Sequence, residues 1–131
     1  MTTIDLISEK NKEIVLAFYK EAHFDGDVDG AIARYVGDTY TQHTPGAEDG
    51  VEGLRAYINA FLANFPKAKG NIRRVIADGD IVAVHAHWTD LISANGDVGV
   101  DIFRVSGGKL VEHWDVIAPI PDVSKNNNTM Y

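Results

Sequence analysis

The second half of the chain alternates apolar stretches with glycine-containing turns, and this pattern constrains the fold more than any other feature. Turns are expected at residues 78–80, at residues 93–97 with their Asn-Gly pair, and at residues 106–109. The intervening runs are rich in Val, Ile and aromatic residues, and they predict strands over residues 71–77, 81–91, 98–105 and 110–118. Short turns join antiparallel neighbours, so the sequence predicts a meander of at least four strands.

The first half carries apolar residues at helical spacing. Helices are predicted over residues 8–22, with Ser8 as the N-cap, over residues 28–35, capped by Asp27, and from Val51 to Pro66, with Asp49 as a possible cap. The start of the connector 38–50 can form a short strand before Pro45-Gly46 turns the chain. The order predicts an α+β fold, with three N-terminal helices packed in a curved antiparallel sheet around a conical cavity.

The length of 131 residues fits one domain, and the 45% of hydrophobic residues is typical of a globular protein. We expect a single domain over residues 1–121 and a flexible tail over residues 122–131. The sequence contains no cysteine, which excludes disulfides, a thiolate nucleophile and Cys-ligated metals.

Acidic residues outnumber basic ones by 19 to 12, giving a formal charge of −7. Without a basic cluster such a surface repels phosphates, so we expect no nucleic-acid partner. We also expect no membrane partner, because no apolar run approaches the roughly 18 residues of a spanning helix. The N-terminus lacks the pattern of a signal peptide, which leads us to expect a cytoplasmic protein.

Histidines and acids interrupt the predicted strands. His85 and His87 lie two apart and share one strand face, while Trp88 belongs to the apolar face with Val84 and Ala86. The two histidines indicate either a site or a half-exposed face. Likewise, His43 can line a site or hydrogen-bond its own loop.

Asp101 lies within an otherwise apolar strand, where a carboxylate either serves chemistry or forms a surface ion pair with Arg104 or Arg73. Its face depends on the length of the preceding turn. An odd number of loop residues would place Asp101 beside His87, whereas a two-residue loop would place it beside Trp88.

The last predicted strand contains Glu112-His113-Trp114-Asp115. His113 and Asp115 share one face, and Glu112 and Trp114 share the other. Four such residues in a row are unusual for packing alone, so some of them line a cavity or an interface. Alternatively, Trp88 and Trp114 make core or dimer contacts, and Glu112 lies at a solvated or interface position.

Three segments resemble one known family. They are Tyr40-Thr-Gln-His-Thr-Pro45 with Asp49-Gly50, Gly79-Asp80-Ile-Val-Ala-Val-His85, and Asp101-Ile-Phe-Arg-Val with Gly108-Lys-Leu-Val-Glu-His-Trp-Asp115. Over residues 8–120 the chain resembles the SnoaL-like polyketide cyclases of the NTF2-like superfamily, and more closely the SnoaL-like proteins predicted to catalyse aldol condensation. Thr44 departs from the pattern, which has Asn at that position.

The resemblance implies a cone of curved sheet filled by helices, a cavity at its wide end, and a homodimer formed through the outer sheet face. In the characterised cyclases, an aspartate on a central strand acts as acid and base beside a histidine on the neighbouring strand. These roles carry over to Asp101 and His87. Gln42 and His43 would lie near the mouth of the cavity.

The leading hypothesis is a cofactor-free acid/base enzyme, of lyase or isomerase type, acting on a small or polycyclic carbonyl compound. Asp101 would remove a proton alpha to the carbonyl, and His87 would stabilise the enolate oxygen. The residues expected to bind the substrate are His43, Gln42, His85, His113, Asp115, Trp88 and Trp114.

Two other hypotheses stay open. The same cavity could belong to a non-catalytic module that binds a small hydrophobic ligand, and binding would then depend little on pH. Alternatively, His85 and His87 could bind a metal with a third ligand such as His113 or Asp101, although no metal is expected from the leading hypothesis. The long helical first half is unlike a cupin.

Overall fold

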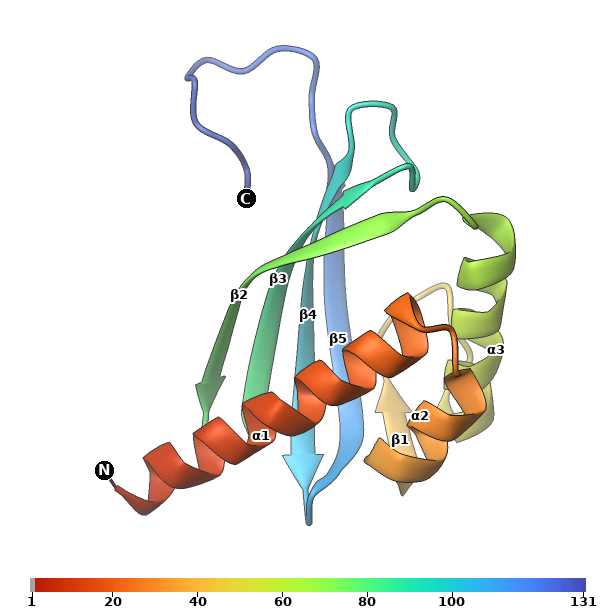
Figure 1. Ribbon diagram of the computed structural model, residues 1–131, viewed down its shortest axis with the longest axis vertical. Helices are drawn as coiled ribbons and strands as arrows, with labels where there is room; N and C mark the ends of the chain where they lie inside the picture. The colour runs from red at the N-terminus through yellow and green to blue at the C-terminus, as the bar shows by residue number, and fades with distance from the viewer. Residues whose placement is uncertain (1) are drawn as a thin grey trace.

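The computed structural model describes residues 2–131 and joins an N-terminal set of helices to one five-stranded sheet (Figure 1). The elements are α1 (Thr3–Tyr19), a π-helical turn η1 (Lys20–Phe24), α2 (Val28–Tyr35), β1 (Val36–Gln42), α3 (Gly50–Asn64), β2 (Lys69–Asp78), β3 (Ile81–Thr89), β4 (Asp97–Ser106) and β5 (Lys109–Pro119). The α+β prediction is confirmed, and each of the predicted helices and strands is present, α2 with the predicted bounds and the others with altered ones.

The sheet has the strand order β1-β5-β4-β3-β2. β2 to β5 form the predicted antiparallel meander, and β1 joins its far edge in parallel with β5. This parallel pairing brings Gln42, from the connector, opposite His113, 71 residues further along the chain.

The first helix begins earlier than expected. Thr2 is its N-cap, and Thr2 and Asp5 form a reciprocal capping box, so the predicted start at Ser8 is wrong. Ser8 is instead buried in the helix, where its hydroxyl donates to the Ile4 carbonyl oxygen and accepts the Gly79 N–H, both at 2.8 Å. Ser8 therefore fixes α1 to the β2–β3 turn.

Asp27 caps α2 as predicted, and its carboxylate accepts the Gly30 N–H at 3.0 Å. Asp49 occupies the N-cap position of α3 but makes no side-chain cap bond there. Its carboxylate accepts the Gln42 N–H at 2.8 Å instead. This bond is the main reason that the pKa of Asp49 lies below its ordinary value. Asp49 thus fixes the end of β1.

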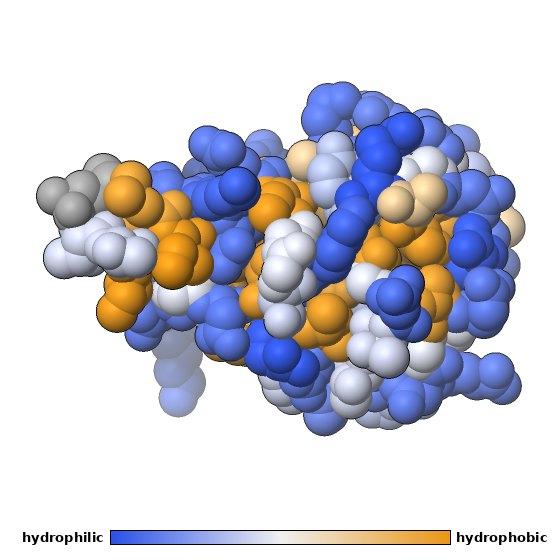
Figure 2. Space-filling model, turned by 90° about the horizontal axis from the view of Figure 1, so that it is seen from below, coloured by the Kyte–Doolittle hydropathy of each residue, from blue (hydrophilic) through white to orange (hydrophobic). Residues whose placement is uncertain are grey.

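The helices enclose a core against the sheet. α1 crosses in front of the sheet and packs on β2 and β3, while α2 and α3 lie beside β1 (Figure 1). At the start of α1, however, Ile4, Leu6 and Ile7 are exposed, and Figure 2 shows apolar surface at this end of the molecule. None of the helices in residues 2–131 is long and apolar enough to cross a membrane.

Residues 122–131 contain no helix or strand. The segment returns to the sheet, where the Tyr131 ring stacks on His87 with 3.8 Å between ring centroids. The Arg73 guanidinium lies 5.4 Å from the centre of the same Tyr131 ring. The flexibility of the tail stays a prediction.

Candidate active site

A largely apolar cavity of about 140 Å³ lies between the helices and the inner face of the sheet. Its wall is mostly aromatic and aliphatic, and a few polar side chains converge on it from β1, β4 and β5. The lining residues whose side chains carry a polar atom are Tyr19, His23, Tyr40, Gln42, Tyr57, Trp88, Asp101, His113 and Asp115. A cavity of this composition is the usual setting for binding a small molecule.

Asp101 faces the cavity, and His87 does not. Asp101 pairs with Val84, whose side chain is fully buried, and His87 pairs with Val98. Asp101 therefore shares the face of Val84 and Trp88, while His87 points to the outer face and stacks on Tyr131. The predicted partnership of Asp101 with His87 is wrong, because the β3–β4 loop holds an even number of residues between paired positions.

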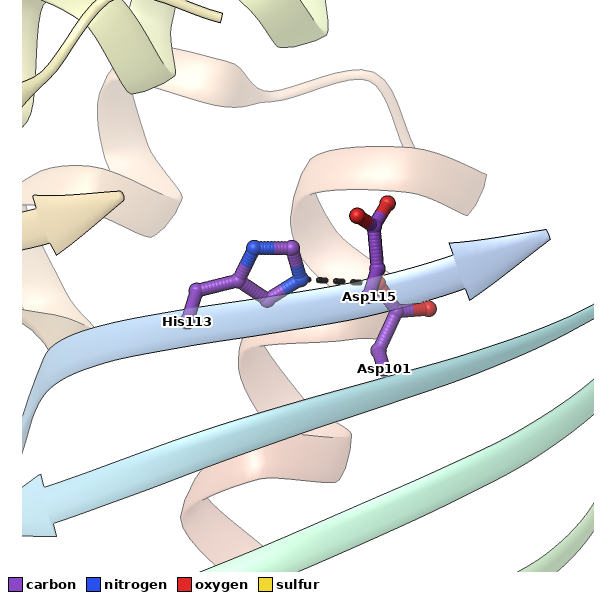
Figure 3. Close-up of side chains that lie close together, drawn as sticks. All are labelled: Asp101, His113 and Asp115. Carbon is purple, nitrogen blue, oxygen red and sulfur yellow. Dashed lines mark hydrogen bonds and ion pairs between the residues drawn. The ribbon is translucent and has the colours of Figure 1, made fainter. Parts of the chain in front are cut away.

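The partner of Asp101 is His113 on β5. A two-residue Gly107-Gly108 turn pairs Ser106 with Lys109, but a β-bulge then leaves Val111 without a partner on β4. Past this bulge, Phe103 lies opposite His113, and Asp101 lies opposite Asp115. Figure 3 shows the resulting cluster, with the His113 ring directed at Asp101 and the Asp115 carboxylate beside it. The distance between His113 Nε2 and Asp101 Oδ1 is 2.8 Å.

The other ring nitrogen of His113 is a donor. Gln42 Oε1 lies 2.8 Å from His113 Nδ1 and 3.1 Å from the Thr44 backbone nitrogen. The Thr44 N–H can only donate, which identifies the Gln42 atom as the amide oxygen. An amide oxygen can only accept, so Nδ1 of His113 must carry a hydrogen.

This assignment places a proton between His113 and Asp101. If the imidazole were neutral with its hydrogen on Nδ1, Nε2 would present a lone pair to a carboxylate at 2.8 Å. Two acceptors do not approach so closely unless a proton lies between them. The pair is therefore either an imidazolium with a carboxylate, or a neutral imidazole with a carboxylic acid. In both forms it can exchange a proton with a molecule in the cavity.

Two hydroxyls complete the cluster. The Tyr19 hydroxyl donates to Asp101 Oδ2 at 3.3 Å, and the Thr44 hydroxyl donates to Asp115 Oδ1 at 2.8 Å. Burial, as the main cause, and the negative charge of Asp101, as the second, raise the pKa of Tyr19 well above its usual value. The phenol therefore stays protonated and can donate a hydrogen bond. The Asp101 side chain is still 19% exposed, which leaves it accessible from the cavity.

The structure divides the residues that the sequence singled out. Gln42, Trp88, His113 and Asp115 line the cavity with Asp101. His43, His85 and Trp114 are not among the lining residues. His43 stacks on Trp114 at a centroid distance of 4.8 Å and contacts Glu112, which also accepts from Arg104. His85 and Trp114 lie outside the cavity because their strand positions have the opposite parity, whereas His43 follows the end of β1.

The register also separates the residues of the predicted metal site. His85 lies on the outer face, where its Nδ1 contacts the Arg74 guanidinium, and His113 and Asp101 lie on the inner face. These residues cannot share one ion, so that hypothesis is wrong. Asp101, His113 and Asp115 each present one atom within 4.8 Å of the others, a spacing that could also hold a cation.

Sequence reasoning missed Tyr19, His23, Tyr40 and Thr44 as site residues. Tyr19 and His23 belong to the helical segment, and their four-residue spacing indicates a shared helical face. Tyr40 and Gln42 share a strand face, so the Tyr-x-Gln pattern could have indicated that Tyr40 lies beside Gln42. No sequence signal placed the Thr44 hydroxyl against Asp115.

His23 makes the stability of the fold depend on pH. Burial lowers the pKa of His23, and the charge of Asp101 opposes this only in part. Below pH about 6.5 the unfolded state therefore binds more protons than the folded state, and stability falls as the pH falls. We expect His23→Phe to reduce this loss, which one proton limits to about 1.4 kcal/mol per pH unit. Urea unfolding of both proteins at pH 7.5 and 5.5 measures it, and equal losses would contradict the assignment.

The sequence profile of the SnoaL-like domain family matches residues 15–113. Among solved structures, the chain is similar to a proposed polyketide cyclase from Acidithiobacillus ferrooxidans, with 26% identity and a TM-score of 0.69, over 82% of this chain and 87% of that one. No curated protein sequence matches this chain at a significant level.

More distant structures share the fold. A proposed SnoaL-like polyketide cyclase from Jannaschia sp. CCS1 has 20% identity and a TM-score of 0.73, over 89% of each chain. IdmH, a proposed polyketide cyclase from Streptomyces antibioticus, has 20% identity and a TM-score of 0.66, over 81% of this chain and 91% of that one. The expected NTF2-like fold is confirmed. Because the family profile spans most of the chain, this protein belongs to the SnoaL-like domain family.

Proposed function

We propose that this protein is a cofactor-free acid/base enzyme that removes a proton alpha to the carbonyl of a small cyclic ketone or β-keto ester, as in an aldol condensation or cyclisation. The observation that carries the proposal is the 2.8 Å contact between Asp101 Oδ1 and His113 Nε2 at the wall of an apolar cavity. The similarity to proposed polyketide cyclases supports the same class of reaction.

The proposed proton transfer needs no reagent other than Asp101 and the substrate. The Asp101 carboxylate takes the α-proton, the C–H electrons form a C=C bond, and the carbonyl π electrons move to oxygen as an enolate. His113 holds the imidazolium form beside Asp101 and replaces His87 as the partner histidine. Gln42 is a positioning residue, since it acts through the Nδ1–H of His113.

The size of the cavity limits the substrate. A cavity of about 150 Å³ is known to hold a benzene molecule, so about 140 Å³ accommodates one ring. The lining residues Tyr57, Ile92 and Ile117 are 39%, 65% and 44% exposed, which shows that the cavity opens to solvent beside them. A polycyclic substrate would place one ring inside and extend the others through this mouth.

Proton abstraction can be measured without knowledge of the later steps. We expect the protein to accelerate exchange of α-protons for deuterium in cyclic ketones and β-keto esters, followed by NMR in D₂O. The comparison is with a matched concentration of a solvent-exposed carboxylate variant, Asp38→Asn, which should exchange as fast as the unmodified protein. If no compound in the panel exchanges faster than with buffer alone, the proposal is refuted.

Non-catalytic binding of a small ligand is the second candidate function. Both oxygens of Asp101 already have hydrogen-bond partners, Tyr19 and His113, as expected of a group that only organises a pocket. The protein would then bind a small apolar ligand without converting it. Such a binder would show affinity for cyclic ketones with no α-proton exchange, and its affinity for a neutral ligand would change little between about pH 5.5 and 8.

We also propose a homodimer formed through the outer sheet face, on which Ile76 is 63% exposed. Ile76→Lys would place a charge in this apolar interface, so we expect a monomer in light-scattering measurements after size exclusion. Ile92→Lys is the control, because Ile92 is similarly exposed but lies at the cavity mouth. An Ile76→Lys protein that remains dimeric would rule out this interface.

We also propose that this protein is located in the cytoplasm. Fractionation of the source cells, with an antibody against this protein, tests the proposal. Recovery in a membrane or secreted fraction would contradict it.

A further inference from the structure

One polar group in the cavity wall has no role in the cluster described above. Tyr40 is only 3% exposed, and within residues 2–131 its hydroxyl is one of two buried side-chain polar atoms without a hydrogen-bond partner in the protein. The other is Nδ1 of His23. Burying a hydroxyl without a partner costs roughly 1–3 kcal/mol, so natural proteins rarely leave one free unless something else satisfies it.

The fold makes Tyr40 part of the cavity wall. Tyr40 and Gln42 lie on the inner face of β1, and α3 packs over this strand and adds Leu54 and Ile58 to the same cavity wall. Burial, followed by the charge of Asp101, raises the pKa of Tyr40 well above its usual value. The phenol therefore stays protonated and can donate at any physiological pH.

The other two tyrosines of the cavity either have a hydrogen-bond partner in the protein or are exposed to water. Tyr19 already donates to Asp101, and Tyr57 is 39% exposed, so water can reach it. Tyr40 alone combines a buried hydroxyl with a free hydrogen. In the part of the chain that the structure describes, it is thus the cavity tyrosine able to serve a bound molecule.

We propose that the Tyr40 hydroxyl is the subsite for an oxygen of the ligand, a carbonyl in the bound ketone and the enolate oxygen once the α-proton has moved to Asp101. The enolate part rests on the proposed function, whereas the carbonyl part requires only binding. If the protein is an enzyme, Tyr40 is a catalytic residue, because it touches the enolate oxygen on which negative charge develops.

The subsite is tested with two ligands that differ only in the carbonyl group, 1-indanone and indane, titrated by NMR. The unmodified protein should bind the ketone more tightly than the hydrocarbon. Tyr40→Phe should weaken ketone binding roughly tenfold and leave indane binding unchanged, the effect of one buried hydrogen bond. Tyr35→Phe is the matched control, because Tyr35 is partly buried but does not line the cavity, and this variant should keep the preference for the ketone.

A stability measurement excludes misfolding as the cause. Tyr40→Phe deletes an unsatisfied buried hydroxyl, so its urea midpoint should equal or exceed that of the unmodified protein. The proposal is overturned if the unmodified protein does not prefer the ketone, or if Tyr40→Phe keeps the preference. It is also overturned if Tyr35→Phe loses as much of that preference.

The enzyme proposal and the Tyr40 subsite can be refuted independently of each other. If no α-proton exchange is found but Tyr40→Phe abolishes the preference for the ketone, the enzyme proposal falls and the subsite stands. If exchange is found and the preference does not depend on Tyr40, the enzyme proposal stands and the oxygen must be bound elsewhere.

Discussion

Asp101→Asn is expected to lower α-proton exchange by roughly 10²–10⁴-fold, the range contributed by a positioned general base. The amide cannot take a proton, but it has the shape of the carboxyl group. It can still accept the Tyr19 hydroxyl and can donate to His113 Nε2, so both hydrogen bonds of the cluster persist. The protein should therefore fold normally. Exchange is measured by NMR on the best ketone of the panel.

Two controls separate this effect from a general change in charge. Asp38→Asn removes an exposed carboxylate from β1 and should leave exchange unchanged. His113→Gln removes the ring that shares the proton and should slow exchange while ketone binding persists. An Asp101→Asn protein that exchanges as fast as the unmodified one would end the assignment of Asp101 as the base.

Trp88→Ala is expected to destabilise the fold by about 3–5 kcal/mol, the usual cost of truncating a buried Trp. Trp88 is 5% exposed, and its ring lies 5.4 Å from the ring of Phe61 and 6.3 Å from that of Tyr19. It thus joins β3 to α1 and α3 at the cavity wall. The melting temperature should fall by about 10–20 °C, as measured by calorimetry.

Phe24→Ala provides the matched control, because Phe24 belongs to the same aromatic group but is 43% exposed. It should cost less than about 1.5 kcal/mol. Equal losses for the two variants would mean that Trp88 does not anchor the core. Trp88→Phe should recover part of the stability.

The sequence predicted the elements well because their signals are local. Periodicity and turn residues place α2 at residues 28–35 and the four strands of the meander within a few residues. The start of α1 was missed because the Thr2–Asp5 capping box precedes the apolar stripe on which the prediction relied.

The site depended on register, which is a non-local property. Asp101 was identified from its unusual neighbours, but its partner could not be, since one residue of loop length moves every following side chain to the other face. Gln42 reaches His113 only through the parallel pairing of β1 with β5, which no local pattern specifies. The roles of Tyr40 and Thr44 depend on the same long-range contacts.

The unpaired Val111 makes the β4–β5 hairpin sensitive to length in a way that substitution cannot reveal. Removing Val111 would restore regular pairing and would keep Glu112 opposite Arg104, so His113 and Asp115 would still face the cavity. If Val111 were kept but paired regularly with Arg104, the rest of β5 would move by one position, and Glu112 and Trp114 would face the cavity instead. A one-residue gap at Val111 is therefore compatible with the same cavity wall, and alignments across this hairpin must place that gap correctly before residue identity is compared.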